Sequence, residues 1–148
     1  MNKIRTFILA VTSKLDWLPG LLARFTIGLI FVPTGWGKLH HLPQVIEYFQ
    51  SLGIPAPQLQ APFVASVELV CGTLVLIGLF TRVAAAPLIG TMVVAIWTAK
   101  LPDVKDLSDF LSLSEYLFII LLIVLIIKGA GAVSVDYVLS KRAPSSTQ

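Results

Sequence analysis

The chain has 148 residues, of which 56% are hydrophobic and 13% are charged. Soluble domains carry about 25% charged residues, so this composition, with a mean hydropathy of +0.87, excludes a water-soluble globule and a disordered chain. The single cysteine excludes an internal disulfide and any motif of paired cysteines. The net charge of +3 is modest, and no basic patch of the kind that binds nucleic acid is present.

Four apolar segments predict membrane-spanning helices. A bilayer core about 30 Å thick requires roughly 20 helical residues, and lipid offers backbone polar groups no water to bond. None of the segments shows the alternating pattern of a strand. The predicted spans are 18–36, 62–80, 83–99 and 111–127. The sequence therefore predicts an all-α integral membrane four-helix bundle.

The loop between the first two spans carries a further helical pattern. Between Leu42 and Leu52 the apolar residues fall at helical spacing and polar residues lie between them, which is typical of a short amphipathic helix in the membrane interface. Gly53 predicts the end of this helix. We expect the helix to lie in the first outer loop, either as a cap on the outer face of the bundle or as a plain connector.

The distribution of basic residues predicts the orientation of the chain. With the N-terminus inside the cell, the inner side holds Lys3, Arg5, Lys14, Arg82, Lys128, Lys141 and Arg142, and the outer side holds Lys38, Lys100 and Lys105. Because cytoplasmic loops are enriched in Lys and Arg, we expect both termini in the cytoplasm.

The same pattern divides the chain into three parts. We expect a cytoplasmic juxtamembrane segment at residues 1–17, a four-span membrane domain at 18–128 and a cytoplasmic polar tail at 129–148. Within these, residues 1–16 are predicted to form a helix on the membrane surface and residues 142–148 a disordered end.

Two charged residues interrupt the first two spans. An ionised side chain at mid-membrane costs about 2.5–3.5 kcal/mol on insertion scales, so Arg24 and Glu68 are expected to face protein or a wet cavity. Their Cα atoms would differ in depth by roughly 9 Å, a gap that the arginine side chain can cover. Side chains on a helix point toward its N-terminus, however, which sends these two groups apart. The sequence therefore does not decide whether Arg24 and Glu68 form a direct or water-bridged pair.

Small residues share the helix faces of these charges and predict close helix contacts. Such residues let membrane helices approach each other. The small residues expected to face the bundle are Gly28 and Gly35 on the first span, Ala61, Ala65 and Gly72 on the second, and Ala86 and Gly90 on the third. The fourth span has no comparable edge, so we expect its aliphatic run to face lipid or a second copy of the chain in a homodimer.

Polar and aromatic residues converge at one depth in the outer half of the predicted bundle. Glu68 and Glu115 lie at nearly the same level, which also receives Trp36, Lys38 and His40 from the first span and Trp97 from the third. Polar groups that converge within an apolar bundle are typical of a small-molecule site. Trp and Lys equally mark the interface of most membrane helices, so both interpretations stand.

Metal and haem sites are not predicted. His40 and His41 are the only histidines, and adjacent residues on a helix point in different directions, which excludes a bis-histidine haem within one subunit. The sequence also contains no glycine-rich phosphate loop and no nucleophile triad.

Three segments resemble the DoxX family of small membrane proteins. The first is Arg24 followed by FVPTGWGKL at 31–39, the second is FQSLGIP at 49–55, and the third is ELVCGTLVLIGLFTRVAA at 68–85. The resemblance implies a four-helix, multi-pass protein of the bacterial inner (cytoplasmic) membrane with a link to redox chemistry. Some members of that family are subunits of a thiosulfate:quinone oxidoreductase or a quinol oxidase.

The leading hypothesis is an accessory or anchoring subunit of a membrane redox system. The chain has no cysteine pair and no haem-ligand pair, so electrons would have to reside on a bound quinone, the one candidate cofactor, or on a redox partner protein. A standalone enzyme is therefore not expected. Glu68 would accept a proton or a hydrogen bond from a quinol hydroxyl in a pocket in the outer half, and Trp36 or Trp97 would stack on the ring.

Two other classes of function stay open at this stage. A small transporter or permeability factor would use Arg24 and Glu68 along a polar path. A purely structural membrane subunit would use the same charges to specify helix register.

Overall fold

The computed structural model describes residue 15, residues 17–131 and residues 133–142, which contain helices and no β-strand. In chain order the elements are α2 (Leu18–His40), α3 (Leu42–Ser51), α4 (Pro57–Ile77), α5 (Thr81–Ala95), the π-helical segment η1 (Ile96–Lys100), the 3₁₀ turn η2 (Leu101–Asp103), α6 (Leu107–Leu111), α7 (Ser114–Lys128) and α8 (Val135–Arg142). The predicted all-α class is confirmed. The predictions for residues 1–14, 16 and 143–148 lie outside the described residues.

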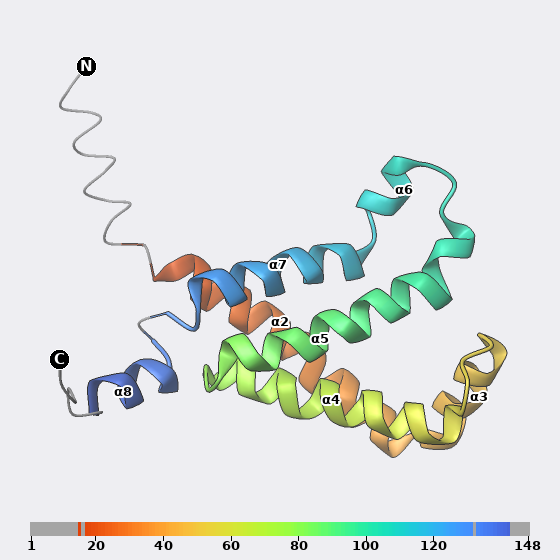
Figure 1. Ribbon diagram of the computed structural model, residues 1–148, viewed down its shortest axis with the longest axis horizontal. Helices are drawn as coiled ribbons and strands as arrows, with labels where there is room; N and C mark the ends of the chain where they lie inside the picture. Colours follow the sequence, from red (N-terminus) through yellow and green to blue (C-terminus); the bar gives the residue numbers. More distant parts are fainter. Residues whose placement is uncertain (1–14, 16, 132, 143–148) are drawn as a thin grey trace.

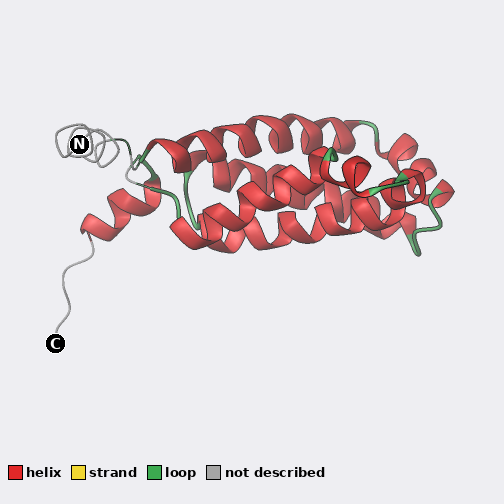
Figure 2. Ribbon diagram, turned by 90° about the horizontal axis from the view of Figure 1, so that it is seen from above, coloured by secondary structure: helices red, strands yellow, loops and turns green. Residues whose placement is uncertain are grey.

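The helices α2, α4, α5 and α7 pack into one elongated bundle (Figures 1 and 2). Its core contains Ile27, Val75, Leu88, Leu122 and Leu125, all fully buried. One end of the bundle carries α3 and the other carries α8 (Figure 1). We call these the α3 end and the α8 end.

Three helical segments are long and apolar enough to cross a membrane. They are Leu18–His40, Pro57–Ile77 and Thr81–Asp103, the last formed by α5, η1 and η2 in continuity. The fourth helix, α7, has 15 residues and is therefore about 22 Å long, short of a bilayer core of about 30 Å. A fourth span at α7 stays a prediction, and it requires local thinning of the bilayer.

The closest helix contact joins α2 and α4 through glycines. A Cβ atom placed on Gly35 would lie 2.5 Å from the backbone nitrogen of Leu69, and one on Gly72 would lie 2.8 Å from the Cβ of Phe31. These glycines lie on the predicted small-residue faces. The predicted small edge of the third span is present only in part, because Gly90 lines a cavity at the α3 end, whereas Ala86 is exposed and does not line it.

The short helix predicted between the first two spans is present as α3. It contains no fully buried residue and lies against the start of α4 (Figure 1). Gly53 follows it with a φ of +70°, a conformation that glycine adopts at little steric cost.

The turn between α4 and α5 is closed by a Schellman motif. Gly78 has a φ of +74° and donates to the carbonyl of Val75 at 3.1 Å, while Leu79 donates to Leu74 at 2.9 Å. Phe80 follows with a φ of +49°, a left-handed conformation that is uncommon for a bulky residue. Hydrogen bonds from the backbone of this turn to the carboxylate of Asp136 stabilise it.

Candidate functional site

A cavity of about 800 Å³ lies at the α3 end of the bundle, lined by residues of α2, α3, α4, α5, η1 and α7. Its lining is mostly apolar, and α3 with the loop after it contributes Val45, Tyr48, Phe49, Leu52 and Ile54. Small-molecule sites commonly measure about 300–1,000 Å³ and combine an apolar lining with a few polar groups. The cavity therefore has the size and character of such a site.

An ion pair between Lys38 of α2 and Glu68 of α4 forms the polar part of the cavity wall. The Nζ of Lys38 lies 2.6 Å from Oε1 of Glu68, and the two side chains are 28% and 2% exposed. The second carboxylate oxygen, Oε2, is buried and accepts no hydrogen bond from any residue in the described part of the chain. A buried acceptor without a donor is costly, so the Glu68 carboxylate would be stabilised by a ligand hydroxyl that donates a hydrogen bond to it.

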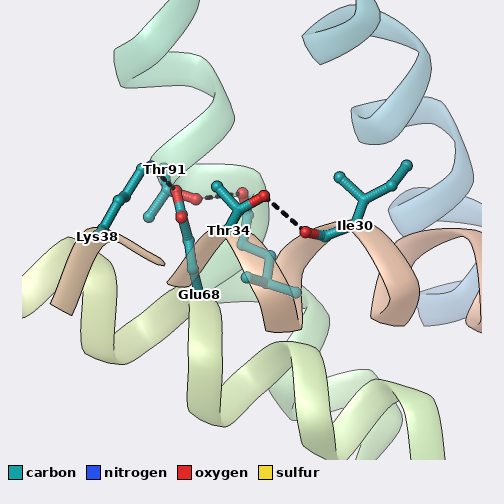
Figure 3. A network of polar contacts seen from close by, with 6 residues as sticks. Ile30, Thr34, Lys38, Glu68 and Thr91 are labelled. Atoms are coloured by element: carbon teal, nitrogen blue, oxygen red, sulfur yellow. Dashed lines mark hydrogen bonds and ion pairs between the residues drawn. The ribbon is translucent and has the colours of Figure 1, made fainter. Parts of the chain in front are cut away.

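Two threonines lie beside this ion pair. Thr34 donates its hydroxyl to the carbonyl of Ile30 at 2.6 Å, and Thr91 donates to the carbonyl of Leu88 at 2.9 Å. Figure 3 shows the side chains of Thr34, Lys38, Glu68 and Thr91 gathered from three helices. Because each hydroxyl already donates its proton to a carbonyl, the threonine oxygens can act only as hydrogen-bond acceptors toward a molecule in the cavity.

A second ion pair lines the same cavity in a more exposed position. The Nζ of Lys100 lies 3.6 Å from Oε1 of Glu115, with side chains that are 45% and 16% exposed. Lys100 ends the π-helical segment η1, and Glu115 lies in the first turn of α7. π-Helical turns are rare and often occur at functional sites.

The structure brings only part of the predicted site together. Lys38, Glu68 and Glu115 line the cavity, whereas Trp36, His40 and Trp97 do not. Trp36 precedes Lys38 by two residues, a rotation of about 200° around the helix. Its side chain is 58% exposed, and the centroid of its ring lies 4.3 Å from the centroid of the His40 ring. Trp97 is 73% exposed.

The expected stacking of Trp36 or Trp97 on a ligand is therefore not supported by their positions. The aromatic rings that line the cavity belong to Phe31, Tyr48, Phe49, Phe63 and Phe118. The two tryptophans occupy exposed positions of the kind that face the membrane interface.

Arg24 is buried at 3% exposure but does not pair with Glu68. Its Nε donates to the carbonyl of Val75 at 3.0 Å and its Nη2 to Leu76 at 2.9 Å. Its Nη1 donates to Ala130 at 2.9 Å and to Val133 at 2.5 Å. The arginine therefore joins segments at the α8 end of the bundle, and it does not line the cavity that Glu68 lines.

Asp136 is a residue that sequence reasoning missed. Its carboxylate accepts hydrogen bonds from the backbone N–H groups of Phe80 at 2.8 Å and Thr81 at 3.2 Å, and its own N–H donates to Gly78 at 2.9 Å. The carboxylate thus caps α5 and holds the left-handed Phe80. One signal was available, since Asp136 is the only acidic residue after Glu115.

No metal centre is evident, because the described residues contain no group of three or more His, Cys, Asp or Glu side chains placed to hold an ion. The polar groups of the cavity are two Lys–Glu pairs, hydroxyls and the amides of Gln44 and Gln60, which bind by hydrogen bonding and charge.

Comparison with known proteins identifies the family. The DoxX family model matches residues 20–101. The chain is 39% identical to the uncharacterized membrane protein Rv3486 of Mycobacterium tuberculosis, over 81% of this chain and 80% of that protein. It is 33% identical to the putative oxidoreductase CatD of Bacillus subtilis, over 69% of this chain and 71% of CatD.

A third relative covers a larger share of both chains. The inner membrane protein YqjF of Escherichia coli is 26% identical over 88% of this chain and 98% of its own length. No solved structure is significantly similar. The family match, the apolar helices and these membrane relatives agree, and the chain belongs to the DoxX family of membrane proteins.

Proposed function

We propose that this DoxX protein is an accessory or anchoring subunit of a membrane redox system, and that its cavity binds a quinone-like molecule. One observation carries the proposal: Glu68, whose Oε2 is buried and has no hydrogen-bond partner among the described residues, lines an apolar cavity of about 800 Å³. Similarity to a putative oxidoreductase adds support.

The Lys38–Glu68 pair suits both redox states of such a ligand. The carboxylate of Glu68 can accept a hydrogen bond from a quinol hydroxyl. The ammonium of Lys38 has three protons, of which the ion pair uses one, so it can donate to a quinone carbonyl. A bound quinone would supply two-electron carriage, while the protein holds the polar head and packs phenylalanine side chains against the ring.

The position of the cavity suits a ligand dissolved in lipid. Among its lining residues, Phe63 of α4 is 67% exposed and Val94 of α5 is 47% exposed. These apolar side chains line the cavity and also reach the outer surface of two helices that are long and apolar enough to span a membrane. A lipophilic molecule can therefore enter from the side of the bundle.

Equilibrium binding tests the pocket. We expect ubiquinone or menaquinone analogues to bind the detergent-purified protein in titration calorimetry, and Glu68→Gln to weaken quinol binding at least about tenfold, since a hydrogen bond to a charged group contributes about 1.5–3 kcal/mol. Glu47→Gln is the matched control, because Glu47 is exposed on α3 and does not line the cavity. Equal affinities in the two variants would contradict the role of Glu68.

A steric pair of variants tests the cavity without altering charge. Gly90 lines the cavity, and a Cβ placed on it meets no atom within 4 Å. Gly37 has equally open surroundings but does not line the cavity. We expect Gly90→Leu to abolish binding and Gly37→Leu to preserve it.

The accessory role has its own test. The purified chain should bind quinol without oxidising it when a soluble electron acceptor is added, and oxidation should require membranes that contain a redox partner. Turnover by the purified chain alone would contradict the accessory role and leave the pocket intact.

The proposal also includes three features of the whole chain. Both termini lie in the cytoplasm, the membrane domain extends from residue 18 to residue 128, and the chain forms a homodimer. With the α8 end in the cytoplasm, Arg82, Lys128 and Lys141 obey the preference of basic residues for that side. A phosphatase fused to the C-terminus should then be inactive. Cross-linking in native membranes tests the expected homodimer.

A further inference from the structure

A second hollow, of about 530 Å³, lies at the α8 end between α5 and the end of α7. Arg82 of α5 and Lys128 of α7 line it from two different helices, and Gly129 and Gly131 contribute backbone. The guanidinium of Arg82 reaches across to α7, where its Nη2 lies 3.4 Å from the carbonyl oxygen of Ile127. Two cations thus lie on neighbouring sides of one concave surface.

The acidic residue of this hollow is already engaged. Asp136 also lines it, but its two carboxylate oxygens accept the N–H groups of Phe80 and Thr81, where a negative charge stabilises the start of α5. The ion pairs found in the described residues join Lys38 to Glu68 and Lys100 to Glu115. Arg82 and Lys128 therefore keep their charge available for an anion.

Large apolar side chains flank the two cations. Val83, next to Arg82, is 71% exposed, and Ile127, next to Lys128, is 70% exposed. Phe80 is 63% exposed at the edge of the same hollow, held there by its left-handed backbone and the carboxylate of Asp136. In a helix that spans a membrane, such positions face acyl chains, while the cations lie at the headgroup level.

We propose that this hollow binds the headgroup of an anionic phospholipid, with the phosphate between Arg82 and Lys128 and the acyl chains along Val83 and Ile127. A guanidinium binds phosphate oxygens in a bidentate manner, and basic hollows between membrane helices suit anionic headgroups. A zwitterionic lipid fits less well, because its own cation would meet the two basic residues. The site is separate from the cavity at the α3 end and is independent of the function proposed for it.

The experiment measures thermal unfolding of the detergent-purified protein with added phosphatidylglycerol, phosphatidylcholine or inorganic phosphate. We expect phosphatidylglycerol to raise the unfolding midpoint and the other two to leave it nearly unchanged. Lys128→Gln and Arg82→Gln should each weaken the apparent affinity about fivefold, since each basic residue contributes about 1 kcal/mol to attraction by anionic lipid.

Lys105→Gln is the matched control, because Lys105 is an exposed lysine at the opposite end of the bundle. Native mass spectrometry, which counts bound lipid, supplies a second measurement that does not depend on the stability of each variant. Equal stabilisation by inorganic phosphate would overturn the lipid in favour of a free anion. Equal stabilisation by phosphatidylcholine, or equal lipid binding in Lys128→Gln and Lys105→Gln, would overturn the site.

Discussion

The guanidinium of Arg24 donates a 2.9 Å hydrogen bond to the carbonyl oxygen of Ala130, 106 positions further along the chain. The same side chain donates to Val75 and Leu76 in the last turn of α4. The last carbonyls of a helix have no intrahelical donor, and the C-terminal end of a helix dipole favours a cation. Arg24 meets both needs and ties the segment after α7 to the rest of the bundle.

Replacement of Arg24 should therefore destabilise the whole bundle. The amide of Arg24→Gln has two protons, so at least two of the four carbonyls would lose their donor. We expect the free energy of unfolding in detergent to fall by about 3 kcal/mol or more, because each hydrogen bond to a charged group contributes about 1.5–3 kcal/mol. Arg24→Lys, which keeps the charge without the planar fork, should lose less.

Lys105→Gln is the control for this measurement. Lys105 is exposed, and surface substitutions usually change stability by less than about 0.5 kcal/mol. Equal losses in Arg24→Gln and Lys105→Gln would mean that the carbonyl contacts of Arg24 do not stabilise the protein.

Gly35 and Gly37 offer a matched pair that tests the α2–α4 contact. A Cβ on Gly35 would lie 2.5 Å from a backbone nitrogen of α4, while a Cβ on Gly37 would meet nothing within 4 Å. Overpacking costs typically about 1–3 kcal/mol, so Gly35→Ala should lower the unfolding midpoint in detergent. Gly37→Ala should be neutral or stabilising by up to about 1 kcal/mol, because alanine favours a helix interior. Equal effects would contradict close backbone packing.

The part of the fold that depends on local pattern could be predicted from the sequence. The length of the apolar segments predicted the long apolar helices. The spacing of apolar residues between Leu42 and Leu52 predicted the short helix α3. The glycines of α2 and α4 predicted the close contact between these helices, because residues without a side chain on a buried helix face allow two backbones to approach each other. The small-residue edge of α5 was predicted only in part. Gly90 lines the cavity, but Ala84 and Ala85 are buried while Ala86 is exposed, because small residues occur on both faces of this helix.

The site could be predicted only in part, because its geometry depends on contacts between distant segments. Depth along the helices placed Lys38 near Glu68, but rotation around α2 decides that Lys38 faces the cavity and Trp36 does not. The carbonyl partners of Arg24 lie partly beyond α7, in a segment whose pattern predicts no structure. Backbone carbonyls carry no sequence signal, so the sequence left open a pairing of Arg24 with Glu68, whereas the structure gives Arg24 carbonyl partners.

Loss of the Asp136 carboxylate should loosen the α8 end while leaving the α3 end unchanged. Asp136→Ala removes the two acceptors that hold Phe80 and Thr81, a loss comparable to that of a helix cap, about 0.5–2 kcal/mol. We expect faster hydrogen–deuterium exchange in the turn at 78–81 and in α8, measured by mass spectrometry of peptides. Asp103→Ala, at the far end of the helix that begins with Thr81, should leave that exchange unchanged. Unaltered exchange in Asp136→Ala would show that the cap does not hold the turn.

A double-mutant cycle on Lys38 and Glu68 separates their pairing from the role of Arg24. Removing one member of a buried ion pair leaves the other charge without its partner, whereas removing both does not. Glu68→Gln and Lys38→Met should therefore be less harmful together than the sum of their separate effects. The coupling energy is expected within the range of about 0.5–3 kcal/mol seen for contacting residues.

The comparison cycle combines Glu68→Gln with Arg24→Gln. These two residues have no hydrogen-bond partner in common among the contacts of the described chain, so their costs should add within about 0.5 kcal/mol. Additive costs for Lys38 and Glu68 would mean that their 2.6 Å contact contributes nothing to stability. Strong coupling between Arg24 and Glu68 would instead show that the two ends of the bundle act together, because no shared contact could produce it.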